Sequence, residues 1–329
     1  MNNKAKIIKL AELSVKIVIL LFGILILYKK LIINQNVTDI IADIEDSFKN
    51  KSQFALMLLA IFFVPLNLYL EAIKWKLQIK PIENISNWKS FLSIFTGMTA
   101  GMFFPNRMGN FLGRIFMLEK GDRIKAAMVT IVGGMAQMIA TVCIGLLALI
   151  LYVKKNYVLI GILSVLIIIT LLLYFNIHLL NYFQFLIPKK FKEKTEEYFK
   201  VFSLYDKKEL LKILLLSFVR YFLYTFQFVL LIWAFGIPLT YLKAMIPISL
   251  TYLAMMIVPF ITITEIAVRG SVSVVIFENW LMMNGINSSY GMMVFTASSL
   301  LWIFNIAIPA IIGLFLTYRL KFFRNKDES

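Results

Sequence analysis

Cysteine and histidine are almost missing from this chain of 329 residues. There is one of each, Cys143 and His178, so the sequence excludes an internal disulfide and a histidine-rich metal centre. Acidic residues are also scarce, 18 against 34 Lys and Arg, which gives a formal net charge of +16. No phosphate-binding loop of the form G-x-x-x-x-G-K-[ST], zinc motif or nucleophile elbow occurs. The composition therefore predicts no metal, no cofactor, no use of ATP and no enzymatic activity.

Apolar residues, by contrast, are abundant and make up 60% of the chain. Runs such as 157–177 and 303–318 approach or reach the ~20 residues that a helix needs to cross a bilayer. The basic residues lie in short stretches between such runs, which is typical of membrane-protein loops rather than of a nucleic-acid-binding domain. No small-residue cleavage site follows the apolar run 17–28, so we interpret this run as a retained first helix.

The predicted fold class is all-α, a polytopic membrane bundle with six full spans and two re-entrant hairpins. The spans are 13–33, 54–73, 126–153, 157–177, 211–235 and 291–318, and the hairpins are 88–120 and 241–280. We expect one integral membrane domain over 1–329. It includes an amphipathic helix on the inner surface at about 188–208 and a short cytoplasmic tail at 319–329.

The distribution of Lys and Arg predicts the orientation of the chain. With the N-terminus inside, 24 of the 34 basic residues fall in cytoplasmic segments and 7 outside, so both termini are expected in the cytoplasm. The halves, about 1–155 and 156–320, each contain three spans and one hairpin. Because three is odd, the halves would be inserted in opposite senses, as in many transporters. The alternative is that both hairpins are ordinary kinked spans.

Two apolar stretches are interrupted at corresponding places in the two halves. The first break contains Pro105 and Gly109, and the second contains Pro259 and Gly270. Non-helical backbone at bilayer depth is tolerated only inside protein or against a water-filled cavity. A matched pair of breaks therefore points to a transport-type site, and we expect the two breaks to meet near the midplane. G-x-x-x-G patterns at 97–101 and 109–113 predict close contact between the limbs of the first hairpin.

Arginines within apolar stretches are candidate binding residues, because a partner or a cavity must offset the cost of placing them there. In the first hairpin these are Arg107 and Arg114, with Asn110 as a neutral hydrogen-bonding neighbour. Guanidinium groups bind phosphate and carboxylate through paired hydrogen bonds, so the hairpin could hold an anionic head group. Alternatively, Arg114 only extends to the cytoplasmic interface.

Two further groups of polar residues lie within apolar stretches. Arg220, Tyr224 and Gln227 share one face of the span 211–235, which should point inward, although Tyr224 could instead anchor the helix at the interface. Glu265 and Arg269 have the spacing of a helical ion pair, which could be structural or could open to bind a substrate. These residues complete the candidate substrate-binding set.

Glu71 differs from these residues, because it comes near the end of its predicted span. Lys74, Trp75 and Lys76 follow it closely. We therefore interpret Glu71 as an interfacial residue rather than a functional one.

Two short motifs resemble a known family. The stretch 105–114 resembles the P-G-R-x-G-E-x-x-x-R type signature of the lysylphosphatidylglycerol synthase transmembrane region family. The stretch 265–270 resembles its second signature, an acidic residue followed by G-V-R-E or G-V-R-G. Asn106, Asn110 and Ala267 depart from the Gly, Glu and Gly that are usual at those positions.

A third stretch strengthens this resemblance. Arg220 and Tyr221 with Gln227 look like the corresponding span of stand-alone bacterial members. The resemblance implies a flippase-like protein of the bacterial cytoplasmic (inner) membrane. It would move an anionic phospholipid or an isoprenoid-linked lipid between leaflets. The synthase activity of the family belongs to a soluble domain and is not expected here.

Two other functions stay open from the sequence. The protein could transport a small water-soluble anion through the same two hairpins. It could also be a non-transporting subunit for a separately encoded enzyme of lipid or envelope synthesis. The expected partner is membrane lipid as substrate, without nucleic acid, and the oligomeric state is left open.

Overall fold

The structure is a computed structural model. It describes residues 45, 49–102, 104, 109–119, 121–153, 156–177, 198, 200–258, 264–286 and 290–317. All regular secondary structure within these ranges is helical, as the sequence predicted. The first predicted span, 13–33, lies outside the described residues, as does most of the predicted amphipathic helix at 188–208.

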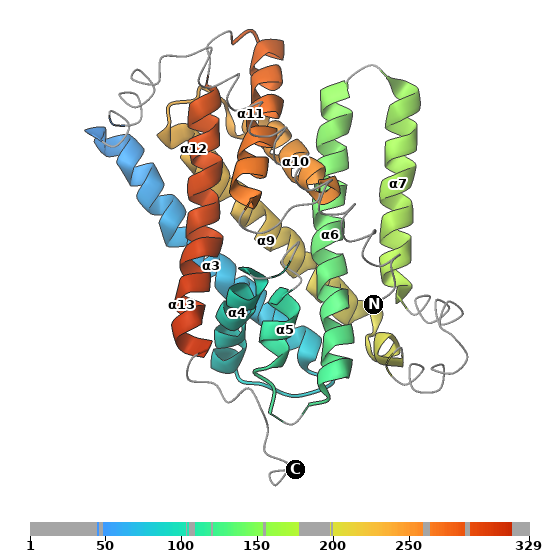
Figure 1. Cartoon of the computed structure of the whole chain (residues 1–329). Helices are drawn as coiled ribbons and strands as arrows, with labels where there is room; N and C mark the ends of the chain where they lie inside the picture. The colour runs from blue at the N-terminus through green and yellow to red at the C-terminus, as the bar shows by residue number, and fades with distance from the viewer. Residues whose placement is uncertain are drawn as a thin grey trace, which may run out of the picture. The chain divides into compact units, whose positions relative to one another are not determined.

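The helices follow one another in an order that repeats (Figure 1). They are α3 (Lys51–Ile79), α4 (Asn87–Met102), α5 (Gly109–Ile115), α6 (Arg123–Val153), α7 (Tyr157–Phe175), η5 (Lys200–Leu204), α9 (Lys207–Ala234), α10 (Tyr241–Ile257), α11 (Glu265–Met283), α12 (Gly291–Trp302), η6 (Ile303–Ala307) and α13 (Ile308–Thr317). From α3 to α6, a long helix is followed by two shorter helices around a break and then by a second long helix. The order from α9 to α13 is the same, as expected if the halves are related.

Six helical segments among the described residues are long and apolar enough to cross a membrane. They are Lys51–Ile79, Arg123–Val153, Tyr157–Phe175, Lys207–Ala234, Glu265–Met283 and Gly291–Leu316. Five of them coincide with predicted full spans. The sixth, α11, was predicted as one limb of a hairpin, and its 19 residues are long enough for a full span.

Helix α3 continues beyond the predicted end of its span at residue 73. It continues because apolar residues keep recurring on one face: Ala72, Trp75 and Ile79 are almost completely buried. Glu71 therefore lies about two turns before the end of the helix. Glu71 is buried inside the protein, although its place in the sequence suggested an exposed residue. Its depth in the membrane stays a prediction.

The chain divides into two compact units. Unit 1 comprises Met1–Phe63 and Thr225–Asn305, and unit 2 comprises Val64–Tyr224 and Ile306–Ser329. The first division falls within α3, between Phe63 and Val64. The other two fall within α9 and within η6. This partition reflects packing rather than sequence symmetry, so the proposed relation between the halves 1–155 and 156–320 stays a prediction.

In unit 2, α4 and α5 form the predicted close hairpin and lie side by side in Figure 1. A Cβ atom at Gly113 would lie 2.7 Å from the Cα of Gly97 and would collide with the Thr96 carbonyl. The side chain of Asn110 occupies the space beside Gly101. Glycine is therefore required at position 113, where the backbone of one limb meets the backbone of the other.

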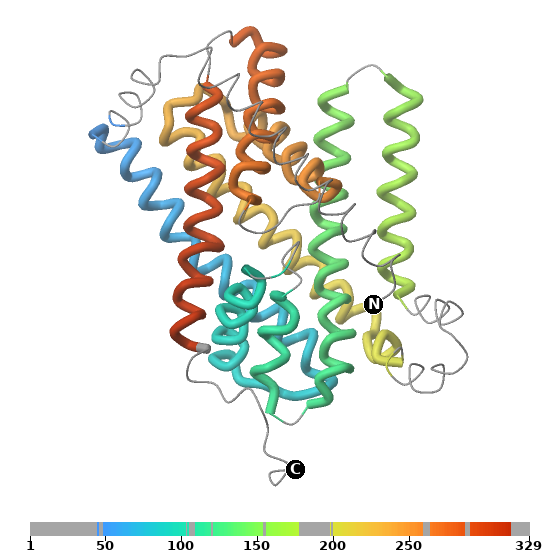
Figure 2. Tube along the Cα trace, viewed as in Figure 1, coloured from blue at the N-terminus to red at the C-terminus, as the bar shows by residue number. Residues whose placement is uncertain are grey.

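Helices α13, α6 and α7 complete the described packing of unit 2. The Thr99 hydroxyl on α4 lies 2.7 Å from the Ala310 carbonyl oxygen on α13 and 3.1 Å from that of Phe95. A Cβ atom at Gly313 would collide with the Phe95 carbonyl, so α13 lies as close to α4 as α5 does. Figure 2 shows α6 and α7 running side by side in opposite directions.

In unit 1, α11 packs against both α10 and α12. Gly270 was predicted to form part of the second hairpin break, but it lies inside α11. A Cβ atom there would collide with the ring of Phe295 on α12. The prediction for Gly270 is therefore corrected: its small size allows two helices to pack closely and does not break a helix.

Candidate functional site

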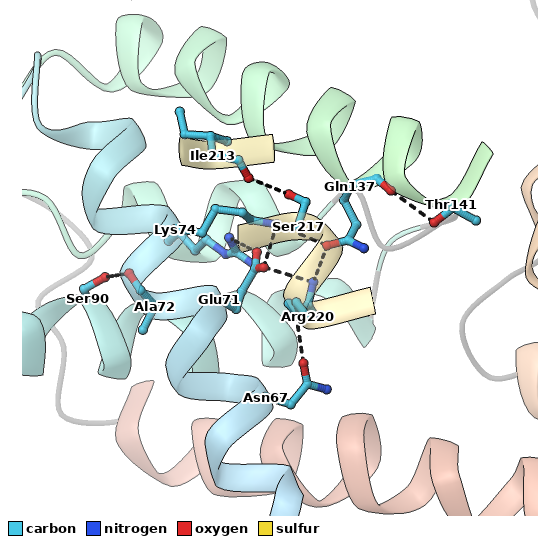
Figure 3. Close-up of polar contacts among 11 residues, drawn as sticks. Asn67, Glu71, Ala72, Lys74, Ser90, Gln137, Thr141, Ile213, Ser217 and Arg220 are labelled. Carbon is cyan, nitrogen blue, oxygen red and sulfur yellow. Dashed lines mark hydrogen bonds and ion pairs between the residues drawn. The ribbon is translucent and has the colours of Figure 1, made fainter. Parts of the chain in front are cut away.

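Four charged side chains meet inside unit 2, and Figure 3 labels three of them, Glu71, Lys74 and Arg220. Arg114 Nη1 lies 2.8 Å from Glu71 Oε1. Lys74 Nζ and Arg220 Nη1 lie 2.7 Å and 2.9 Å from Glu71 Oε2. Three cations therefore share one carboxylate, and these four groups together carry a net charge of +2.

The cluster is buried, except on one side. The side chains of Glu71, Lys74 and Arg114 are 7%, 3% and 9% exposed, whereas that of Arg220 is 22% exposed. Placing charges in such surroundings is costly unless each one is paired and hydrogen-bonded. Arg220 is therefore the member of the cluster that an incoming group could reach most easily.

Two amide side chains support the cations. Arg220 donates from Nε to Asn67 Oδ1 at 3.1 Å and from Nη1 to Gln137 Oε1 at 3.2 Å. Lys74 Nζ also donates to Gln137 Oε1, at 3.4 Å. Figure 3 shows the oxygen of Gln137 turned toward Arg220 and Lys74 and its nitrogen turned away. The amides thus present acceptors to a group of side chains that is rich in donors.

The sequence of α3 places its polar residues on one face. Asn67, Glu71, Lys74 and Gln78 follow each other at intervals of four, three and four residues, the spacing of one helical stripe. The stripe faces α6, where a Cβ atom at Gly133 would collide with the side chain of Gln78. Gly133 therefore lets α6 approach this polar stripe.

The acceptors of the cluster are used, whereas some buried donors of the cluster and of its neighbours on α3 are not. Both oxygens of Glu71 contact cations, and each of the two amide oxygens accepts a hydrogen bond. Arg114 Nε, Trp75 Nε1 and Gln78 Nε2 are buried without a hydrogen-bond partner among the described residues. The Arg114 guanidinium lies 5.9 Å from the centre of the Trp75 ring. The site therefore has spare positive charge and spare N–H groups, which suits an anion with several oxygen atoms.

Two of the predicted binding residues come together in this cluster. Arg114 and Arg220 lie on different helices, and the carboxylate of Glu71 joins them. The alternative that Arg114 extends to the interface is wrong, since its side chain is buried against Glu71 and Trp75. Lys74, which follows Glu71 near the predicted end of its span, also belongs to the cluster.

The other predicted residues of the first hairpin and of α9 lie elsewhere. Asn110 fills the space beside Gly101 between the two limbs of the hairpin. Tyr224 is half-buried on α9. Gln227 belongs to unit 1, where it is fully buried and donates from Nε2 to the Ala60 carbonyl at 2.8 Å. Arg220 and Gln227 thus share a helix face, but Arg220 makes its contacts in unit 2 and Gln227 in unit 1.

Both charged candidates of the second hairpin are buried in unit 1. Glu265 is the first residue of α11, and Arg269 lies one turn later. Arg269 donates from Nη2 to the Ser298 carbonyl on α12 at 2.8 Å, which ties the two helices together. Their use by a substrate stays a prediction.

Three predicted site residues are not described. Pro105, Arg107 and Pro259 lie outside the described residues, so the expected meeting of the two breaks also stays a prediction. Within the described ranges, no group of His, Cys, Asp and Glu side chains could hold a metal ion.

The sequence matches the family described as the lysylphosphatidylglycerol synthase TM region over residues 13–313. The chain belongs to this family. By that description, the family covers the transmembrane region of the synthase, which agrees with the six apolar helices. The protein is therefore a multi-pass membrane protein, and the resemblance drawn from the motifs is confirmed. Comparisons with curated proteins and with solved structures gave no match.

Proposed function

We propose that the protein moves a lipid with an anionic head group between the two leaflets of the bacterial cytoplasmic membrane. The buried cluster around Glu71 carries this proposal, because three cations face one carboxylate inside a membrane protein. Ionisable residues within membrane segments usually mark a substrate pathway. An anion that binds there would offset the excess charge and accept from the unused donors.

A head group would reach the cluster through Arg220, the most exposed of its side chains. The fatty-acyl or isoprenoid tails would remain in the bilayer, so only the polar part of the lipid would need to leave water. In this proposal the protein transports and does not catalyse a covalent reaction. Its termini would lie in the cytoplasm, in line with the distribution of basic residues.

The test is lipid transfer in liposomes that contain the purified protein and either phosphatidylglycerol or phosphatidic acid, each with a dithionite-sensitive fluorescent acyl chain. Dithionite added outside destroys the fluorescence of the outer leaflet, so further loss reports lipid that has crossed. We expect the wild-type protein to raise the bleached fraction above that of protein-free liposomes. Arg220→Gln should abolish this gain, whereas Lys208→Gln, an exposed change near the start of α9, should not.

Arg220→Gln should stay folded, because Glu71 keeps Arg114 and Lys74 as partners. Removing one of three crowded cations also spares its desolvation cost, so the melting temperature in detergent should hold or rise. Wild-type protein that leaves the bleached fraction unchanged with both lipids, or Arg220→Gln that transfers them normally, would overturn the proposal.

A further inference from the structure

We infer that the cluster selects a phosphate head group with two negative charges on one phosphorus, a phosphomonoester, over a phosphodiester or a zwitterion. This inference rests on the proposed function and names the chemical class of its substrate. It follows from the number of charges at the site, their spacing and the hydrogen-bonding groups left over.

The number of charges comes first. Lys74, Arg114 and Arg220 contribute three positive charges, and Glu71 is the carboxylate that all three contact in the described part of the chain. A single negative charge would leave one cation uncompensated in a buried site, whereas two would leave none. Uncompensated charge in such surroundings is costly, so a dianion should bind more tightly than a monoanion.

The spacing of the charges shows why both should sit on one group. All three cations lie within 2.7–2.9 Å of the two oxygens of one carboxylate. Their excess charge is therefore concentrated around a single small anion, and two separate diesters could not both approach it so closely. A phosphomonoester carries two charges within one tetrahedral group of comparable size.

The remaining donors indicate the same class of ligand. Arg114 Nε is buried without a partner among the described residues. Arg220 Nη2 makes no ion pair or hydrogen bond with a described residue, since Nε and Nη1 make the polar contacts that join this side chain to the described part of the chain. A phosphomonoester offers three terminal oxygens as acceptors, whereas a diester offers two. Guanidinium groups suit such oxygens because they donate in pairs.

Glu71 takes part in this selection as an internal counter-ion. Its two oxygens hold the three cations together. A phosphate that binds Arg220 would compete with the Oε2 atom of Glu71, which also contacts Lys74. Glu71 therefore keeps the net charge at +2 and sets the preference of the site for two negative charges.

The test measures the thermal unfolding of the full chain in nonionic detergent at increasing concentrations of short-chain lipids. Tryptophan fluorescence monitors the unfolding. The probes are dioctanoyl phosphatidic acid, dioctanoyl phosphatidylglycerol, dioctanoyl phosphatidylcholine and inorganic phosphate. The second pKa of a phosphomonoester is about 6, so phosphatidic acid carries two charges at pH 8 and mostly one at pH 5. The diester charge of phosphatidylglycerol stays constant and serves as the matched control.

We expect phosphatidic acid at pH 8 to bind at least about tenfold more tightly than phosphatidylglycerol, a difference of about 1.4 kcal/mol. This ratio should shrink at pH 5. Arg220→Gln lowers the net charge of the cluster to +1, so it should also remove the preference. Lys208→Gln should leave the preference unchanged.

Each result separates this inference from the function on which it rests. Equal binding of phosphatidic acid and phosphatidylglycerol would overturn the inference, but the proposed transport of a lipid with an anionic head group would stand. Inorganic phosphate that binds as tightly as phosphatidic acid would uphold the dianion site and overturn lipid as its source. If neither phosphatidic acid nor phosphatidylglycerol binds more tightly than phosphatidylcholine, both the inference and the proposed function are overturned.

Discussion

The carboxylate of Glu71 on α3 lies 2.9 Å from the guanidinium of Arg220 on α9, although the two residues are far apart in the sequence. Arg114, from the short helix α5, reaches the other oxygen of the same carboxylate. One side chain thus connects three helices of unit 2. The arrangement makes Glu71 the residue on which the packing of the cluster depends most.

Replacing Glu71 by Gln should destabilise the protein strongly. The change would leave Lys74, Arg114 and Arg220 buried without their shared counter-ion, at a cost of about 3–5 kcal/mol. Thermal unfolding in detergent measures the effect. The control is Glu119→Gln, because Glu119 pairs with a lysine but its side chain is 76% exposed, and it should cost less than about 1 kcal/mol. Equal effects of both changes would contradict a shared buried counter-ion.

Replacing Gly113 by Ala should separate α4 from α5. The new methyl group would meet backbone atoms of Thr96 and Gly97, which cannot move aside as a side chain could. We expect a loss of about 1–3 kcal/mol in the free energy of unfolding, the usual range for overpacking. Gly161→Ala on α7 is the matched control, because nothing lies within 4 Å of its added Cβ atom. That change should be neutral or stabilising by up to about 1 kcal/mol.

The sequence predicted the helical fold and the first hairpin well, because both depend on local patterns. Runs of apolar residues predicted the long helices, and the paired G-x-x-x-G motifs predicted the close contact between Gly97 and Gly113. These features need only spacing along the chain. The end of α3 was harder to place, because charged residues there resemble a loop until their partners are known.

The candidate site was predicted only in part, because its partners come from distant segments. Arg114 and Arg220 were found as charges within apolar stretches. Glu71 and Lys74 were missed, since their pairing with each other and with both arginines exists only after folding. A usable signal was present in the stripe of polar residues that runs along one face of α3 from Asn67.

Replacing Thr99 by Val should weaken the contact between α4 and α13. Its hydroxyl is the group that reaches the Ala310 carbonyl, and helix-to-helix hydrogen bonds in membranes contribute about 0.6–1.7 kcal/mol. Thr170→Val is the control, because the Thr170 hydroxyl contacts only the Leu166 carbonyl of its own helix in the described structure. A Thr99→Val variant as stable as Thr170→Val in detergent would show that the contact contributes nothing.

The predicted orientation can be tested by labelling single cysteines in intact cells. The background is Cys143→Ala, which removes the buried native thiol. A cysteine at position 36 should react with an impermeant reagent added outside, and one at position 194 should react only after the cells are opened. Labelling at position 194 from outside would contradict the inverted arrangement of the halves.

The shortness of α5 has a consequence for how the protein is made. Its 7 residues extend about 10 Å and the 16 residues of α4 about 24 Å, so neither can cross the ~30 Å apolar core alone. A charged arginine within an apolar membrane segment is costly unless it has a partner or faces a water-filled cavity. Arg114 should therefore enter only after α3 has been inserted and presents Glu71. In a Glu71→Ala chain, α5 should stay open to protease on the cytoplasmic side of the newly synthesised protein.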